Sequence, residues 1–452
     1  KYLKRFEYQN AKTDQLWEVL SSVSGKDVKA VMDSWTLQMG FPVVFWNSSS
    51  AVLRQNRFFN NPKSEIEAKQ PNLEWFLNIR YRTSAGKESS ILMEPGKNSS
   101  LKLSKGTKWI KLNTDQKGYY IINYDSKIWT ALAIQLKENH QEFSVSDRCN
   151  LIDDAFKLAA AGFIDYDVPL SLIDYLGEER QIQPWQSAVY NINYILNLIK
   201  ARSPETYILF TSWLRKKTNP ILQDLGWNDT GSNNNERKLR AQIVNLACLT
   251  EDKDCLKITR TMFQNWTKDA TYFISPNYRT AVYRYGLKQA NTYAVWKFLL
   301  TRLVEATSQN EKISLRAALA NINSPWILKR YLEIAENDTV IRKQDYYSVV
   351  YYVCHNEIGN GVFYEYYKNN YEALVRRFGL NDRLFGRFPL YFTATRSTKE
   401  DLNDLTEFFK KYPEAGAGTR ARKQAVANIK TNMEWVETKL PKIHAWLKTH
   451  AV

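Results

Sequence analysis

The stretch QIQPWQSAVYNINYILNLIKAR, residues 181–202, decides the fold class. Four of its apolar residues recur three or four positions apart, so they share one face of an α-helix. These residues are Val189, Ile192, Leu196 and Ile199. The stretch therefore predicts a long amphipathic helix that packs through a single apolar stripe.

The same helical periodicity extends in both directions, from about residue 126 to the end of the chain. A second predicted stripe consists of Val426, Ile429, Met433 and Val436. So long a run of helices without strands does not fit one compact bundle, whereas stacked antiparallel helix pairs can bury all their apolar faces. We predict a mainly α protein in which residues 126–452 form a large α-superhelical domain, similar to HEAT and ARM repeats.

Residues 36–125 follow a different pattern, that of a small β-sandwich domain. The run LNIRYRT, residues 77–83, alternates apolar and polar side chains, which is typical of a half-buried strand. Several short strands separated by turn residues favour a sandwich. The further predicted strands are at residues 43–46, 91–93, 109–112 and 119–122.

Residues 1–35 precede the predicted sandwich and favour one or two short helices. Leu16, Val19 and Leu20 recur at helical spacing, and so do Val28, Val31 and Met32. The sequence thus predicts three parts, at residues 1–35, 36–125 and 126–452.

Length and composition are those of a folded protein with a large core. The chain has 452 residues, of which 44% are hydrophobic and 24% charged, and its net charge is +16. No apolar run reaches the roughly 18 residues that a transmembrane helix needs. The first residues, KYLKR, resemble no signal peptide, and the last, LKTHAV, offer no tail for a lipid anchor. We expect any anchor of the natural protein to lie outside this chain.

Histidines are too few and too widely spaced for a helical zinc site. An H-E-x-x-H site needs two histidines four positions apart, so that both imidazoles lie on one helix face. The chain has only His140, His355, His444 and His450, and it contains no CxxC pair, P-loop or dinucleotide-binding glycine motif. We predict no catalytic residue and no metal site in this chain.

Two cysteines favour a disulfide. Cys248 and Cys255 flank a short polar turn between two helical segments, so a bond between them would join that helix pair in an oxidising compartment. The alternative is two free thiols in a cytosolic helix repeat. Cys149 and Cys354 lie within apolar helical patterns and are predicted to be buried free thiols.

Five Asn-x-Ser/Thr sequons lie in or next to polar loops, where a glycan could project into solvent. With the cysteine pair they favour an extracellular or cell-surface protein. The predicted glycosylation sites are Asn47, Asn98, Asn228, Asn265 and Asn337.

The positive charge does not indicate a nucleic-acid partner. Basic runs such as residues 215–217 and 420–423 are short and interleaved with acidic residues, as on solvated helix faces. The tyrosine-rich stretch 346–371 could stack on bases, but tyrosines at helical spacing are far more often packing between helices. We predict no nucleic-acid binding.

Several runs of residues resemble, in order and along nearly the whole chain, the C-terminal half of the gluzincin zinc aminopeptidases. The similarity begins with WEVL at 17–20 and VMDSWTLQMGFPV at 31–43 and continues with GYYIINYD at 118–125. The run IRKQD at 341–345 is most similar to aminopeptidase N, the membrane alanyl aminopeptidase. The other similar runs are at residues 147–148, 151–156, 178–181, 184–185, 315–320, 326–332, 418–421 and 432–436.

This resemblance implies a function that the chain does not perform alone. Members of the family are membrane-bound or secreted zinc ectopeptidases that remove N-terminal residues from peptides. By resemblance, residues 1–35 are the last helices of a catalytic domain whose zinc ligands lie upstream, and the helical domain caps the substrate chamber. The chain would then need no cofactor itself, its partners would be the N-terminal catalytic half and peptide substrates, and the helical domain could mediate a homodimer or bind an extracellular protein.

The resemblance also brings two arginines into consideration. The family often has Phe-Ser-Thr late in the helical domain, where this chain has Arg396, Ser397 and Thr398. Arg387 and Arg396 are therefore candidate residues of the substrate chamber, with a surface or structural role as the alternative.

Two functions compete. The first is the non-catalytic C-terminal region of a zinc aminopeptidase, inactive alone. The second is a stand-alone α-solenoid binding protein or receptor fragment without peptidase activity. Residues 1–35 favour the first, because the last helices of a catalytic domain have no purpose without the rest of it.

Overall fold

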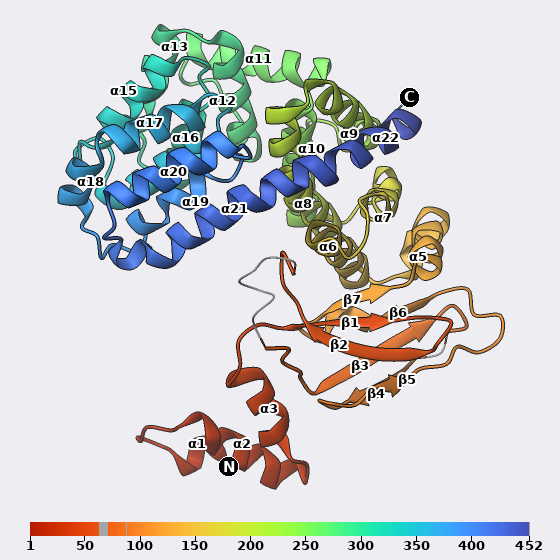
Figure 1. The fold of residues 1–452 in the computed structure, drawn as a ribbon. Helices are drawn as coiled ribbons and strands as arrows, with labels where there is room; N and C mark the ends of the chain where they lie inside the picture. The colour runs from red at the N-terminus through yellow and green to blue at the C-terminus, as the bar shows by residue number, and fades with distance from the viewer. Residues whose placement is uncertain (63–70, 87, 452) are drawn as a thin grey trace. The chain divides into compact units, whose positions relative to one another are not determined.

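The computed structural model describes residues 1–62, 71–86 and 88–451 (Figure 1). The chain forms two compact units, Lys1–Tyr175 and Leu176–Val452. The predicted class, mainly α with a small β region before a large helical region, is confirmed. The predicted domain boundaries after residues 35 and 125 stay predictions.

The first unit begins with three short helices, α1 (Tyr2–Arg5), α2 (Thr13–Ser24) and α3 (Val28–Thr36). The Asp27 carboxylate caps α3 by accepting the Ala30 N–H at 3.0 Å. In residues 1–36, all of which the structure describes, Val19 alone is buried. These helices therefore have almost no core of their own.

Among the described residues, seven strands form two sheets. The four-stranded sheet has the order β5 (Ser99–Ser100), β2 (Val52–Arg57), β1 (Pro42–Trp46) and β7 (Ile121–Tyr124). The three-stranded sheet has the order β4 (Glu88–Met93), β3 (Leu77–Thr83) and β6 (Ile110–Leu112). β1 pairs antiparallel with β2 and parallel with β7. The sequence did not reveal β2 and β5, and it placed the start of β7 two residues early.

Three helices complete the first unit, α5 (Ser126–Asn139), α6 (Val145–Ala161) and α7 (Asp167–Leu172). α6 packs against β7 through polar groups. The Asp154 carboxylate accepts the Ile122 N–H at 2.9 Å, and the buried Lys111 ammonium donates to Asn150 Oδ1 at 2.8 Å. A strand and a helix are thus joined by buried charges, which the apolar pattern alone does not predict.

The helices of the second unit lie in rows. In the first row each helix packs against the next one, and the last helix of the row, α21, packs against the first, α8 (Figure 1). A second row alternates with it along the chain, and its last helix, α22, packs against α9. The stacked helix pairs therefore curve until the end of the unit lies against its beginning. The first row is α8 (Ile182–Arg202), α10 (Asn234–Leu249), α12 (Pro276–Ala290), α14 (Gln309–Leu319), α16 (Lys343–Cys354), α19 (Phe388–Phe392) and α21 (Thr419–Thr438). The second is α9 (Pro204–Leu225), α11 (Lys253–Lys268), α13 (Tyr293–Glu305), α15 (Pro325–Ala335), α17 (Gly359–Asn369), α18 (Tyr371–Phe378), α20 (Lys399–Lys411) and α22 (Leu440–His450).

The apolar stripe predicted on α8 agrees with the structure, whereas the stripe predicted on α21 does not. On α8, Ile192, Leu196 and Ile199 are buried and Val189 is half-buried, as expected. On α21 the predicted stripe is out of phase, because only its Ile429 is buried while Val426, Met433 and Val436 are half-buried. The buried face consists instead of Ala421, Arg422, Ala425, Ile429, Asn432 and Trp435.

Tyrosines between residues 346 and 371 mostly pack between helices, as predicted. Tyr346, Tyr364 and Tyr367 are buried, and Tyr367 lies 5.3 Å from the ring of Phe392. Tyr351 is the exception, since its side chain is 43% exposed. Cys354 is buried as predicted, but Cys149 is only half-buried.

Candidate functional site

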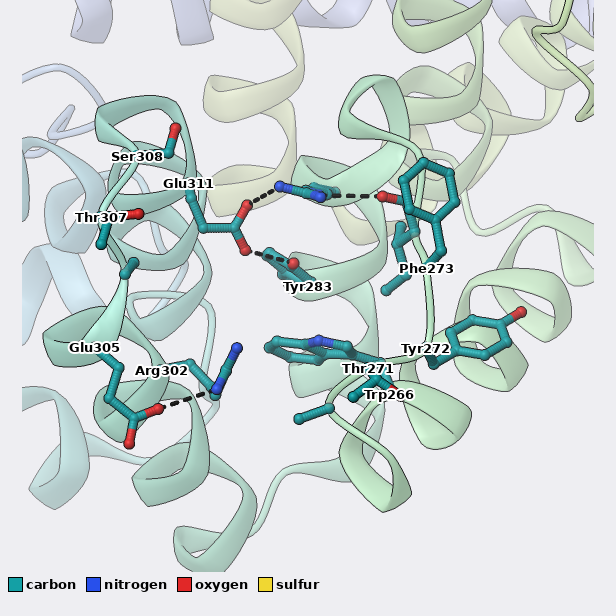
Figure 2. A pocket seen from close by; sticks show the side chains of 14 residues that line it. Trp266, Thr271, Tyr272, Phe273, Tyr283, Arg302, Glu305, Thr307, Ser308 and Glu311 are labelled. Carbon is teal, nitrogen blue, oxygen red and sulfur yellow. Dashed lines mark hydrogen bonds and ion pairs between the residues drawn. The ribbon is translucent and has the colours of Figure 1, made fainter.

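A pocket of about 360 Å³ opens among α11, α12, α13 and α14 of the second unit (Figure 2). The Trp266 indole stacks on the Tyr283 ring, with centroids 4.5 Å apart. Arg302, Glu305 and Glu311 come from the helices on the opposite side. The pocket is thus bounded by rings on one side and charged groups on the other.

The charges of this pocket are paired with one another. Arg279 Nη1 lies 2.5 Å from Glu311 Oε2, and the Tyr283 hydroxyl donates to Glu311 Oε1 at 2.6 Å. Arg302 Nη1 lies 3.0 Å from Glu305 Oε2. Burial and the bond to Glu311 raise the pKa of Tyr283 far above its usual range, so the phenol keeps its proton. The lining can bind a small molecule, but it presents no prepared acid or base among these groups.

The part of the chain that the structure describes contains no set of side chains that could bind a metal ion. Nowhere in residues 1–62, 71–86 and 88–451 do three or more His, Cys, Asp or Glu side chains gather as metal ligands do. His355, for example, forms a hydrogen bond with the Tyr351 carbonyl through Nδ1 at 2.7 Å, and its ring lies tilted against the Tyr351 ring with centroids 4.0 Å apart. The residues that the structure describes therefore do not fit a zinc ion.

The candidate chamber residue Arg396 is held by its neighbours. Its guanidinium lies 2.6 Å from Asp401 Oδ1 and 3.9 Å from the centroid of the Tyr364 ring, and its side chain is 15% exposed. Asp401 also accepts the N–H groups of Ser397 and Thr398 at the start of α20. Arg396 therefore helps to fix the beginning of a helix.

Arg387 is in a different situation, because its side chain is exposed at the end of a short 3₁₀ turn, η4 (Phe385–Arg387). The described residues offer its guanidinium no hydrogen bond and no ion pair. The turn before it is closely packed: Gly386 approaches Gly418 so closely that a Cβ there would lie 2.8 Å from Gly418 Cα. The fold thus presents an unpaired cation beside a closely packed turn.

The structure bonds Cys248 to Cys255 across the turn between α10 and α11, with Cα atoms 5.5 Å apart. Asp252 begins α11 by accepting the Cys255 N–H at 2.9 Å. Both cysteine side chains are buried. The bond therefore fixes the antiparallel arrangement of this helix pair.

Most of the sequon asparagines lie where a glycan would have room. Asn47, Asn98, Asn228 and Asn337 are exposed in loops. Asn265 differs, because it lies inside α11 and is half-buried. Glycosylation at the five positions stays a prediction.

Crossing a bilayer requires a helix that is both long and apolar, and none of the helices in the described ranges meets this requirement.

Comparison with known proteins gives a family match over residues 109–431, to the family described as ERAP1-like C-terminal domain. The glutamyl aminopeptidase of Sus scrofa is 34% identical over 450 residues, which cover 98% of this chain and 47% of that protein. Aminopeptidase A of Gloydius brevicauda is 33% identical over 460 residues, with 99% and 47% covered. Aminopeptidase Ey of Gallus gallus is 30% identical over 465 residues, with 99% and 47% covered.

The chain spans about half the length of the curated relatives it matches. The resemblance to zinc aminopeptidases inferred from the sequence is confirmed at the level of the family. Its narrower similarity to aminopeptidase N stays a prediction, since the relatives at 33–34% identity are glutamyl aminopeptidases and aminopeptidase A. The chain belongs to the ERAP1-like C-terminal domain family.

Proposed function

We propose that this chain is the non-catalytic region of a zinc aminopeptidase that removes N-terminal residues from peptides. The relatives named aminopeptidases are about twice as long as the matched region. The zinc ligands and the catalytic machinery would belong to the other half of the protein. The helical unit would form part of the substrate chamber, and residues 1–35, 36–125 and 126–452 would be the tail of the catalytic domain, the β-sandwich and the cap.

The observation that carries this proposal is the apolar surface of α1–α3. Leu20 is 41% exposed, Val23 is 60% exposed and Met39, just after α3, is 75% exposed. Three helices with one buried residue cannot stabilise themselves, because folding depends on burying apolar area. A further domain that packs on these helices, such as a catalytic half, would bury their exposed apolar side chains. A stand-alone binding protein would have no reason to keep this surface.

We further propose that Arg387 binds an acidic side chain at the N-terminal end of the substrate. The relatives are named glutamyl aminopeptidases, and an unpaired guanidinium offers a carboxylate two parallel hydrogen bonds. Arg396 is the poorer candidate, because Asp401 already occupies its guanidinium.

The test is the preference of the complete enzyme for glutamyl over alanyl anilides. Arg387→Gln should lower kcat/KM for the glutamyl substrate by about ten- to a hundredfold and leave the alanyl substrate nearly unchanged. Arg383→Gln removes an exposed arginine four residues before Arg387 and serves as the matched control. Equal losses on both substrates, or no loss, would show that Arg387 does not select acidic residues.

The same proposal places the protein at the cell surface or outside the cell. The Cys248–Cys255 bond and the four exposed sequon asparagines support an oxidising compartment. A homodimer through the helical unit and an extracellular protein ligand remain proposals of the same kind.

A further inference from the structure

The sequon asparagine Asn337 is held in a turn by the residue two positions after it. Its side-chain Oδ1 accepts the Thr339 backbone N–H at 3.0 Å and the Thr339 hydroxyl at 2.7 Å. Asn337 is exposed, and its amide nitrogen Nδ2 has no acceptor among the residues that the structure describes. The side chain is therefore fixed through its oxygen, while its nitrogen is open to solvent.

Two further sequons share this arrangement. Asn228 Oδ1 accepts the Thr230 N–H at 3.0 Å, and Asn47 Oδ1 accepts the N–H groups of Ser49 and Ser50, each at 3.0 Å. Both asparagines are exposed. In all three turns the asparagine side chain thus bonds the backbone two residues on, which is the geometry of an Asx-turn.

In the two sequons with the sequence Asn-Asp-Thr, the middle aspartate binds a neighbouring helix. Asp229 accepts the Ser275 hydroxyl and the Asn277 side-chain amide, both at 2.6 Å, at the start of α12. Asp338 lies 2.6 Å from Arg377 Nη2 on α18. The asparagine and the threonine of both sequons are exposed. Each loop is therefore tied to the protein by its aspartate and presents the two residues that define the sequon to solvent.

The sequon at Asn265 is different, because it lies inside α11. Residues two apart on a helix do not face each other, so the Asn265 side chain and the Thr267 hydroxyl cannot meet. The Thr267 hydroxyl donates instead to the Gln264 carbonyl at 3.0 Å, and the Asn265 carbonyl accepts the Asp269 N–H at 2.9 Å. The Trp266 side chain between them is buried. The end of α11 would have to unfold before this sequon could be presented to an enzyme.

We propose that Asn47, Asn228 and Asn337 carry N-linked oligosaccharides, whereas Asn265 stays unmodified. This inference rests on the proposed function, which places the protein in the secretory pathway. Nδ2 of each asparagine forms a bond with C1 of the first sugar, the bond between C1 and the diphosphate of a lipid-linked oligosaccharide breaks, and the amide proton leaves with the diphosphate. Asn98 makes no turn bond of this kind with the described residues, so the proposal does not extend to it.

Oligosaccharides at Asn228 and Asn337 also limit which surfaces of the second unit a partner can cover. A glycan is bulky and hydrated, so the loops that precede α10 and α16 stay in contact with solvent. A homodimer or an extracellular ligand therefore binds elsewhere on this unit. A glycosidase should remove both glycans from the native complete protein, and protection of either one until unfolding would contradict this consequence.

The test maps the glycans of the complete protein after secretion from eukaryotic cells. A peptide N-glycosidase acting in heavy-oxygen water converts each glycan-bearing asparagine into a labelled aspartate, which peptide mass spectrometry locates. We expect the label at Asn47, Asn228 and Asn337 and none at Asn265. A label at residue 265, or its absence at any of the other three, would overturn the proposal.

A matched set of variants removes the same hydroxyl from a turn sequon and from the helical one. Thr230→Ala and Thr339→Ala should each lose one glycan, seen as a shift in electrophoretic mobility, because the sequon needs a hydroxyl at this position. Thr339→Ser retains the hydroxyl and should keep the glycan. Thr267→Ala is the control and should leave the mobility unchanged; a shift in this variant would show that Asn265 is modified.

The Cys248–Cys255 bond separates a failure of this inference from a failure of the proposed function. If the bond forms while Asn228 or Asn337 carries no label, the protein has passed through an oxidising compartment and only the assignment of the acceptor sites is wrong. If both the bond and every label are absent, the proposed location is wrong and the assignment falls with it.

Discussion

The ammonium group of Lys111 lies 3.3 Å from the carboxylate of Asp147, and both side chains are at most 3% exposed. This pair joins β6 to α6 inside the first unit. Burial lowers the pKa of Lys111, while the charges of Asp147 and Asp154 oppose that shift. The contact between β6 and α6 is therefore sensitive to the protonation of Lys111, Asp147 and Asp154, because a buried charge is costly without its partner.

Asp154 should make the stability of the protein depend on pH. Burial raises its pKa from 3.8 to about 7. Between about pH 4 and pH 7 the folded state keeps a proton that the unfolded state has lost, so the free energy of unfolding should fall as the pH rises, by at most about 1.4 kcal/mol per pH unit. Above pH 7 this contribution should be constant.

Asp154→Asn isolates the effect, since the amide cannot ionise and its oxygen can still accept the Ile122 N–H. Urea unfolding at pH 5 and pH 8 should show that the variant gains stability relative to the wild type as the pH rises. Parallel loss of stability in the two proteins would mean that Asp154 titrates normally.

The Cys248–Cys255 bond should stabilise the second unit modestly. It closes a short loop, with a sequence separation of 7, so the chain-entropy estimate is about 2.5 kcal/mol. Cys248→Ser with Cys255→Ser should lower the unfolding free energy by up to that amount, and reductant should have the same effect on the wild type only. Peptide mapping without reduction should recover residues 248 and 255 in one linked fragment; a fragment that links Cys149 to Cys354 would refute the assignment.

Two glycines in helices should respond in opposite directions to alanine. A Cβ on Gly286 would lie 2.2 Å from the Phe263 ring, so Gly286→Ala should push α12 away from α11 and cost about 1–3 kcal/mol. Gly361, near the start of α17, has nothing within 4 Å of such a Cβ, and Gly361→Ala should stabilise the protein by about 0.5–1 kcal/mol through helix propensity. Thermal melting of both variants decides the point. Stabilisation by Gly286→Ala would show that the contact between α11 and α12 is looser than described.

How much of the fold can be predicted from the sequence depends on whether the signal is local. The stripe of α8 is predictable because branched apolar residues repeat along one helix. The stripe of α21 is not, because Ala425 and Asn432 take the buried positions where the neighbouring helices come close. Strand β2 was missed since Gln55 faces inward, where its side chain bonds both backbone groups of Trp75.

The candidate sites show the same contrast. Cys248 and Cys255 are close in sequence, so their pairing could be predicted. Arg387 was named by resemblance together with Arg396, and the sequence did not tell the two apart. In the structure Arg396 is paired with Asp401 and lies over the Tyr364 ring, whereas Arg387 is exposed.

Hydrolysis of glutamyl anilide, measured together with bound zinc, tests the central claim most directly. The complete protein, with the half that its aminopeptidase relatives also contain, should bind stoichiometric zinc and cleave the anilide. Residues 1–452 alone should do neither, even with zinc added, since peptide-bond hydrolysis of this kind needs a metal-activated water. Zinc-dependent turnover by residues 1–452 alone, or an inactive complete protein, would contradict the account.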